Sequence, residues 1–261
     1  MSINFHDEKN RCTYTMRQAD SSWINAIRDI VDVKDKQVLD IGCGGGIYCR
    51  ALAEMGATHV TGIDFSAEGL KGAQQHSSGY SNIEFMVGNA LNTGLSNEQA
   101  DIILERALIH HLASNELEAC FVEAHRLLKP GGMLIVQDRT PVDCLQPGST
   151  TNIRGYFFDR FPRLKDAEIA RRRESKEVVN ALLHAGFKGA EERKLWETRA
   201  IYPDIDTLAA DLQGRTGRSI LHELTDEELR ELVNYIRQQF KDDEGEEIVE
   251  QDCWTIWSAV K

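Results

Sequence analysis

Short apolar runs alternate with helical patterns along the first half of the chain, and this alternation predicts the fold. Five runs have the length and the Val, Ile and Leu content of buried strands: Gln37 to Ile41, Val60 to Ile63, Ile83 to Val87, Ala100 to Leu104 and Met133 to Gln137. Between these runs apolar residues recur every three or four positions, as on one face of a helix. Strands that alternate with helices form a parallel sheet covered on both faces. We therefore expect an α/β fold.

The second half of the chain has a weaker apolar period. Residues 141–174 are rich in arginine and aromatic residues without a regular period, and we expect an irregular cap segment there. A helix over residues 175–186 and a long strand over residues 189–201 follow. The last strand is expected over residues 253–260, beside the long strand as an antiparallel pair.

Residues 203–250 have the pattern of a helical insertion before the last strand. Thr225 and Glu228 have the spacing of a capping box, in which each side chain accepts a hydrogen bond from the backbone N–H of the other residue. Apolar residues follow at helical spacing, so we expect a helix that begins at Thr225.

The stretch before the first strand, residues 1–34, predicts one helix. Apolar residues between Trp23 and Val31 recur at helical spacing, with Ser21 or Ser22 as the expected cap. Two interpretations of the segment from Tyr14 to Trp23 stay open: it packs on the sheet, or it folds over the site as a lid. Together with a core over residues 35–140, these segments predict a single domain spanning residues 1–261.

Composition narrows the class of protein. The net charge is −12, and no cluster of five or more Lys and Arg occurs, which argues against a nucleic-acid partner. Six cysteines without a C-x-x-C pair predict reduced thiols rather than a zinc site or a disulfide framework. No signal peptide and no membrane span is expected, so the interpretation is a soluble, cytoplasmic protein. The sequence leaves the oligomeric state open.

Polar residues and glycines follow the predicted strands. Asp40 and four glycines between Gly42 and Gly46 end the first strand, and Asp64, Asn89 and Arg106 end the second, third and fourth. Ligands of open parallel sheets bind beyond the carboxyl ends of the strands. These residues are therefore expected to meet at one binding edge.

The residue types at this edge indicate a nucleoside ligand. Asp64 lies 22 residues after Gly42, where a carboxylate binds the hydroxyls of an adenosine ribose. That spacing suits NAD as well as S-adenosylmethionine. Three features favour S-adenosylmethionine. Ile47 replaces the third glycine of a dinucleotide-binding turn, and Asp40 would repel a pyrophosphate but can orient an ammonium group. Asn89 can accept a hydrogen bond from an adenine amino group.

The chain resembles the class I S-adenosylmethionine-dependent methyltransferases, of the small-molecule group described as ubiquinone-biosynthesis-like. Four motifs over residues 35–140 carry the resemblance: Val38-Leu39-Asp40-Ile41-Gly42-Cys43-Gly44-Gly45-Gly46, Gly62-Ile63-Asp64-Phe65-Ser66, Gly88-Asn89-Ala90 and Leu127-Leu128-Lys129-Pro130-Gly131-Gly132. The resemblance implies a Rossmann-like, seven-stranded, mostly parallel sheet with helices on both faces and an antiparallel last strand. Many relatives have Asp where this chain has Asn89.

The resemblance also implies roles for the motif residues. Asp40, Gly42 and Gly44 would meet the methionine moiety, with Cys43 packing in the same turn. Asp64 would bind the ribose, and Phe65 would stack beside the adenine. The adenine edge would be bound by Asn89 and Ala90, and Arg106 would offer its backbone carbonyl toward the ammonium or sulfonium region.

Two histidines follow the fourth strand, where the methyl acceptor is expected. Methyl transfer from a sulfonium is an in-line displacement, and it needs a base only if the acceptor must lose a proton. His110 or His111 could be that base, because histidine titrates near neutral pH. The alternative, which we favour at this stage, is local packing or hydrogen bonding. Asp138 alone is weak support for a metal-dependent enzyme, and no metal is expected.

The acceptor is expected to be a small molecule, and its pocket is predicted from arginine-bearing segments. Tyr14, Arg17, Arg199, Arg215 and Arg218 are the candidate substrate residues. The arginines could bind a carboxylate or phosphate, or they could form ion pairs with the many acidic residues. A non-catalytic S-adenosylmethionine-binding protein and, less favoured, an NAD-dependent oxidoreductase remain as alternative functions.

Overall fold

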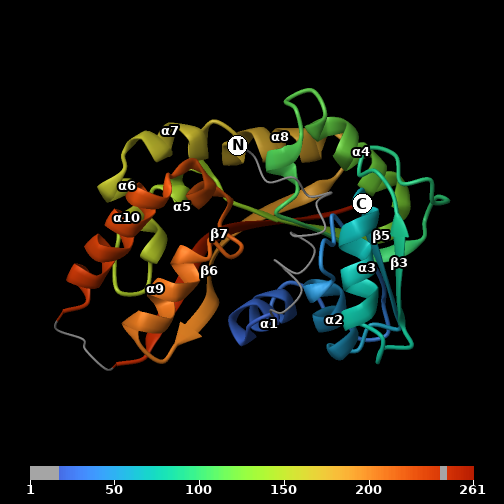
Figure 1. Ribbon diagram of the computed structural model, residues 1–261. Coiled ribbons are helices and arrows are strands. Elements are labelled where there is room, and N and C mark those ends of the chain that lie inside the picture. The colour runs from blue at the N-terminus through green and yellow to red at the C-terminus, as the bar shows by residue number, and fades with distance from the viewer. Residues whose placement is uncertain (1–17, 242–245) are drawn as a thin grey trace. The chain divides into compact units, whose positions relative to one another are not determined.

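The computed structural model describes residues 18–241 and 246–261, and its strands form a seven-stranded sheet (Figure 1). The strand order is β3-β2-β1-β4-β5-β7-β6. The strands are β1 (Gln37–Ile41), β2 (His59–Asp64), β3 (Ile83–Val87), β4 (Ala100–Arg106), β5 (Leu128–Asp138), β6 (Lys188–Tyr202) and β7 (Ile248–Val260). The first five pair in parallel, and β7 is antiparallel to β5. The predicted fold class is confirmed.

The chain divides into two compact units, each with its own core. Within the described residues, the sheet unit comprises 18–138, 173–195 and 255–261, and the helical unit comprises 139–172 and 196–254 without 242–245. The predicted single domain over residues 1–261 stays a prediction.

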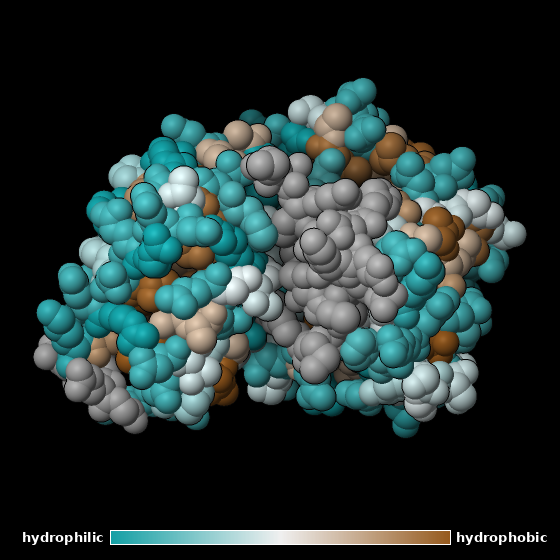
Figure 2. Space-filling view, in the orientation of Figure 1, coloured by the Kyte–Doolittle hydropathy of each residue, from teal (hydrophilic) through white to brown (hydrophobic). Residues whose placement is uncertain are grey.

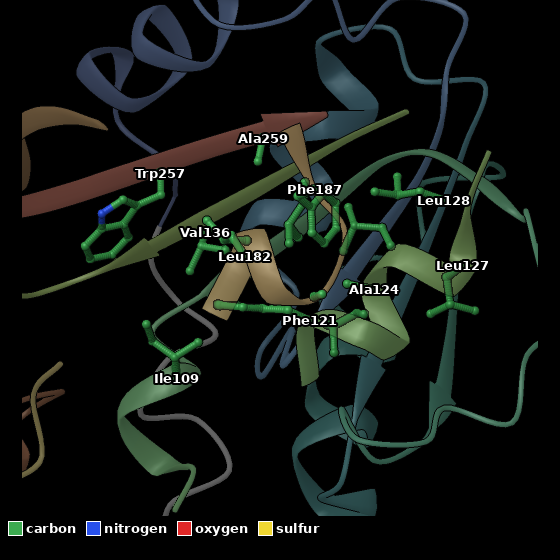
Figure 3. Close-up of a cluster of buried hydrophobic side chains, with 14 of the residues drawn as sticks. Ile109, Phe121, Ala124, Leu127, Leu128, Val136, Leu182, Phe187, Trp257 and Ala259 are labelled. Carbon is green, nitrogen blue, oxygen red and sulfur yellow. The ribbon is translucent and has the colours of Figure 1, made fainter. Parts of the chain in front are cut away.

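Side-chain alternation along the strands gives the sheet unit two apolar layers. Val38, Ile102 and Ile135 pack with α1 (Ser21–Arg28), α2 (Ile47–Glu54) and α3 (Ala67–His76). Leu39, Ile103 and Val136 face the other way, toward α4 (Leu117–Leu127) and α8 (Ser175–His184). Figure 3 shows the second layer, where Phe121 and Ala124 of α4 lie beside Leu182 and Phe187. Both faces are covered, as predicted.

The helical unit corrects one sequence prediction. Residues 141–174 are not irregular: they form α5 (Pro141–Cys144), α6 (Ile153–Arg160) and α7 (Arg163–Ile169). The missing period has a physical reason, because the consecutive residues Tyr156, Phe157 and Phe158 are all buried. Consecutive residues of a helix point in different directions, so burial of all three leaves no one-sided apolar pattern.

The remaining helices of the helical unit lie within residues 203–250, where the sequence predicts a helical insertion. It contains α9 (Ile205–Gln213), η3 (Ser219–Glu223) and α10 (Asp226–Gln239), and α10 contacts both α9 and α6. The capping box of Thr225 and Glu228 is confirmed at the start of α10. β7 begins at Ile248, five residues before the predicted last strand.

Two further boundaries differ from the sequence prediction. The cap of α1 is Asp20 rather than Ser21 or Ser22, because the Asp20 carboxylate accepts the N–H of Ser22 at 2.8 Å. β5 begins at Leu128, five residues before the predicted strand that starts at Met133. Ala100 pairs with Leu128 and Ile102 with Met133, and the intervening residues of β5 form an irregularity in the register.

Hydrophilic residues predominate on the face of the molecule shown in Figure 2, where hydrophobic residues lie in small separate groups. None of the helices in the described part of the chain is long and apolar enough to cross a bilayer. The described cysteines form no disulfide, and Cys43, Cys49, Cys120, Cys144 and Cys253 are buried thiols.

Candidate active site

The turn between β1 and α2 presents a backbone N–H group beyond the end of the strand. Gly42, Gly44 and Gly46 have φ angles of 80°, 50° and 71°, which glycine adopts without steric cost. The N–H of Gly44 donates a hydrogen bond of 2.9 Å to Oδ2 of Asp64, the last residue of β2. A Cβ added at Gly44 would meet no atom of the described residues within 4 Å. The turn therefore leaves room for a ligand against its backbone.

The carboxylate of Asp64 is buried and held by two backbone donors. Oδ2 accepts the N–H of Gly44, and Oδ1 accepts the N–H of Ser66 at 2.9 Å. A carboxylate has about four lone-pair sites, so each oxygen keeps the capacity to accept one more hydrogen bond. This geometry suits the two neighbouring hydroxyls of a ribose.

Asp40 lies on the α2 face of β1 and is 2% exposed. Its Oδ2 accepts a hydrogen bond of 3.1 Å from the Cys49 thiol. Burial raises the pKa of Asp40 to about 7, against the lowering effects of Cys49 and Arg106. A cation placed beside this carboxyl group would favour its ionised form.

Cys43 is a packing residue of the turn. Its thiol is buried; the hydrogen bond with Cys49 lowers its pKa, but burial and the charges of Asp40 and Asp64 raise it above the ordinary value. A thiol with a raised pKa is a poor nucleophile.

The predicted adenine residues lie at the ends of β2 and β3. Phe65 follows β2 and is 55% exposed. Asn89 is exposed, and its Oδ1 already accepts the N–H of Leu91 at 2.9 Å. Ala90 is partly buried beside it. An additional acceptor interaction of Asn89 would use the second lone pair of that oxygen.

The end of β4 carries a cation–π pair and an unusual backbone angle. The Arg106 guanidinium lies 4.2 Å from the ring centroid of Tyr48, at the start of α2. Ala107 follows with φ 54°, and its N–H donates a hydrogen bond of 2.8 Å to the carbonyl of Gln137. A non-glycine residue in this region is strained, and such strain concentrates at functional sites.

His110, in the short helix η2 (Ile109–His111), is held by Asp138 at the end of β5. Its Nδ1 lies 2.8 Å and 3.1 Å from the two carboxylate oxygens, and its backbone N–H donates to Oδ2 at 3.2 Å. Donation from Nδ1–H fixes the tautomer in which Nε2 carries the lone pair. The His111 ring is exposed and lies 4.0 Å from the His110 ring, centroid to centroid.

Asp138 is a partner of His110 that the sequence did not predict. It lies 28 residues after His110, beyond the range of any local pattern. Its position at the carboxyl end of a predicted strand was the available signal. Among the residues that the structure describes, no group of three or more His, Cys, Asp or Glu side chains could hold a metal ion.

The predicted substrate arginines lie in the helical unit, and each has partners there. Arg218 is buried, with Nη1 2.5 Å from Asp211 and Nη2 2.5 Å from Glu250. Arg199 donates to the carbonyl of Thr216 at 2.7 Å, and Arg215 donates to the carbonyls of Leu221 and Leu224 at 3.0 Å. The ion-pair alternative therefore has the structural support. Tyr14 and Arg17 lie outside the described residues.

Sequence comparison identifies the first part of the chain. Residues 38–132 match the methyltransferase domain family. Ubiquinone biosynthesis O-methyltransferase of Pseudomonas fluorescens (strain Pf0-1) is 39% identical over 117 residues, which are 42% of this chain and 47% of that protein. The chain thus spans about half the length of the curated relatives it matches.

Solved structures extend the likeness in fold to nearly the whole chain. Phosphoethanolamine N-methyltransferase 2 of Haemonchus contortus, in complex with S-adenosyl-L-methionine, has a TM-score of 0.61 at 16% identity, covering 99% of this chain and 60% of that one. An S-adenosylmethionine-dependent methyltransferase of Mesorhizobium loti has a TM-score of 0.54 at 20% identity, covering 92% and 98%. At these identities the solved structures show similarity of fold. The match to the methyltransferase domain family is confined to residues 38–132.

Replacing Arg218 by Ala is expected to lower the free energy of unfolding by about 3 kcal/mol. Buried Glu250 would lose its cationic partner at 2.5 Å and keep, among the described residues, only the cation of Arg199 at 3.4 Å, and Asp211 would lose its guanidinium partner. Urea denaturation followed by circular dichroism measures the change. Arg230→Ala, on the exposed side of α10, is the control and should stay within about 0.5 kcal/mol. Equal effects of the two substitutions would contradict a structural role for Arg218.

Proposed function

We propose that this protein transfers a methyl group from S-adenosylmethionine to a small-molecule acceptor. The observation that carries the proposal is the contact between Gly44 and Asp64, which places a carboxylate with spare acceptor capacity beside an open glycine turn. The methyltransferase domain over residues 38–132 supports the same donor. When bound, the sulfonium supplies a methyl group together with its leaving group.

The residues at the strand ends fit the parts of this cofactor. In the proposal Asp64 binds the ribose hydroxyls and Phe65 stacks on the adenine, with Asn89 and Ala90 at the adenine edge. Asp40, Gly42, Gly44 and the carbonyl of Arg106 surround the methionine moiety, and Cys43 packs beneath them. An NAD-dependent oxidoreductase is disfavoured, because the buried carboxyl group of Asp40 would oppose a pyrophosphate at this turn.

The acceptor chemistry follows from the pair of His110 and Asp138. We propose that Nε2 of His110 takes the proton of an acceptor hydroxyl while the acceptor oxygen attacks the methyl carbon. Asp138 holds the ring and stabilises the imidazolium that forms. The curated relative is named an O-methyltransferase, which agrees with a hydroxyl acceptor. An anionic group of the acceptor is not assigned to Arg199, Arg215 or Arg218, because these side chains have internal partners.

Isothermal titration calorimetry tests the donor site: S-adenosylhomocysteine should bind, and NAD should not. Gly44→Ala should keep the fold but weaken S-adenosylhomocysteine binding at least about tenfold, because its Cβ would occupy the space left for the ligand. Gly131→Ala is a matched control, since Gly131 also has a positive φ angle, 77°, and open space at its Cβ position. Similar losses of affinity in both variants would point to backbone strain and contradict the proposed site.

Binding is expected to depend on pH through Asp40. Its carboxyl group has a pKa of about 7 in the folded, ligand-free protein, and the ammonium of the methionine moiety would favour ionisation. The affinity for S-adenosylhomocysteine should therefore rise with pH, by up to about tenfold per unit, and level off above pH 7. Binding below this value should release a proton, which calorimetry detects in buffers of different ionisation enthalpy.

The same carboxyl group affects stability with the opposite trend. The folded protein holds the Asp40 proton up to about pH 7, whereas an unfolded aspartate loses it near its model value of 3.8. Because the folded protein binds this proton more tightly, the raised pKa of Asp40 adds to the free energy of unfolding. This added stability is fully present below pH 3.8 and is lost as the pH rises to about 7. Asp40→Asn should remove both dependences. Glu105→Gln is the control for binding, because burial also raises the pKa of Glu105 to about 7, but its partner is Cys120 of α4.

His110→Ala is expected to lower kcat by about 10²–10⁴-fold with S-adenosylhomocysteine affinity unchanged, because the acceptor would lose its base. Transfer of radioactive methyl groups from S-adenosylmethionine to a fractionated metabolite pool identifies the acceptor first and then measures the rate. His111→Ala is the control and should keep near-normal turnover. Near-normal turnover in His110→Ala would contradict the assignment of His110 as the base. If the wild-type protein methylates no metabolite of the pool, the non-catalytic alternative gains support.

A further inference from the structure

The helical unit contains a cavity of about 290 Å³ whose described lining includes none of the residues assigned to methyl transfer. This lining comes from the loop of residues 145–152 between α5 and α6, from Trp196 on β6 and from Gln251 on β7. All of these residues belong to the helical unit, so the cavity is defined within one compact unit.

The described lining carries no charged side chain, although 28% of the residues of the chain are charged. Amide and hydroxyl groups predominate, and they come from Gln146, Ser149, Thr151, Asn152 and Gln251. Such groups both donate and accept hydrogen bonds, as the hydroxyl groups of a ligand do. A carboxylate or phosphate would meet no cation in this lining. The lining therefore suits an uncharged ligand that is rich in hydroxyl groups.

The loop that forms most of the lining is fixed by its own contacts. Nδ2 of the buried Asn152 donates to the carbonyls of Gln146 and Pro147 at 3.0 Å and 2.9 Å. The loop backbone also packs directly on α6, because a Cβ added at Gly155 would lie 2.2 Å from the backbone nitrogen of Gly148. A ligand that binds to walls already held in place loses less affinity to the ordering of the protein.

Two polar side chains of the lining have hydrogen-bonding capacity left. Asn152 is 6% exposed, and its Oδ1 accepts no hydrogen bond from the described residues. The side chain of Gln251 also makes none with them, whereas its backbone N–H donates to the carbonyl of Thr151 at 2.8 Å. Buried polar groups are normally satisfied, and a ligand hydroxyl group that donates to Oδ1 of Asn152 would supply this partner.

Trp196 gives the cavity an apolar wall. Its side chain is 39% exposed, whereas the other tryptophans of the chain, Trp23, Trp254 and Trp257, are at most 7% exposed. The face of an indole ring carries the negative part of a quadrupole and attracts C–H groups that lie over it. One face of a pyranose ring consists of such C–H groups, and its hydroxyl groups lie around the edge.

We propose that this cavity binds a neutral monosaccharide ring. The C–H face of the sugar packs on Trp196, and its hydroxyl groups exchange hydrogen bonds with Asn152 and Gln251. Ligand pockets commonly have volumes of roughly 300–1,000 Å³, so a cavity of about 290 Å³ fits one sugar ring rather than a chain of them. The site goes beyond the proposed methyl transfer, and its test does not depend on that activity.

Quenching of tryptophan fluorescence by iodide tests the site, because Trp196 is the tryptophan whose side chain is exposed to the ion. The probes are methyl α-D-glucopyranoside, methyl β-D-galactopyranoside and methyl α-D-mannopyranoside. At least one of them should reduce the quenching in a saturable manner. The controls are glycerol, which has hydroxyl groups but no ring face, and uracil, which is planar but is not a sugar. Protection by none of the three glycosides, or equal protection by glycerol or uracil, overturns the proposal.

Variants of the full chain locate the binding, with the affinity for the protecting glycoside measured by calorimetry. Trp196→Ala should weaken binding at least about tenfold, and Trp196→Phe should retain part of the affinity because it keeps an aromatic face. Gln251→Ala should weaken binding about threefold to tenfold through the lost hydrogen bond.

Ile201→Ala is the matched control, because Ile201 is also exposed on β6 but lies outside the described lining. Its affinity for the glycoside should equal that of the wild-type protein. Substitutions at exposed positions such as Trp196 and Ile201 are not expected to unfold the chain. Equal affinities of Trp196→Ala and Ile201→Ala would overturn the assignment of the site.

Discussion

The parallel register of three central strands is the constraint on which the candidate site depends. Ile41 of β1 lies opposite Ile63 of β2 and Glu105 of β4. This register brings the glycine turn, Asp64 and Arg106 to the same edge, although they are far apart in sequence. Gly42 and Cys43 strengthen the alignment, because both donate backbone hydrogen bonds to the carbonyl of Ile63. The contact between Gly44 and Asp64 follows from this alignment.

The alternation of side chains along these strands separates two buried acids. Asp40 faces α2 and contacts Cys49, whereas Glu105 faces α4 and contacts Cys120. Both carboxyl groups have raised pKa values because they are buried, yet only Asp40 lies on the side of the glycine turn. The two carboxyl groups therefore have similarly raised pKa values but lie on opposite faces of the sheet. The position of each residue in its strand decides which carboxyl group can meet a ligand.

The sequence predicts the features that depend on local patterns. Apolar runs located the strands of the sheet unit, and residue types at their ends identified Asp40, Asp64 and the glycine turn. The helices of residues 141–174 were missed because Tyr156, Phe157 and Phe158 are buried on all sides. Ion pairs such as that of Arg218 with Glu250, 32 residues away, depend on tertiary packing and leave no periodic trace. The pairing of His110 with Asp138 was missed for the same reason.

The separation of the apolar cores has a consequence for how this sequence can change during evolution. The matched segment 38–132 lies entirely within the sheet unit, whereas the helical unit is built from two later segments with their own buried cluster. Substitutions inside the helical core do not need compensating changes in the packing around the glycine turn. The helical unit can therefore diverge faster than the sheet unit, and relatives that share residues 38–132 need not share what their helical segments recognise.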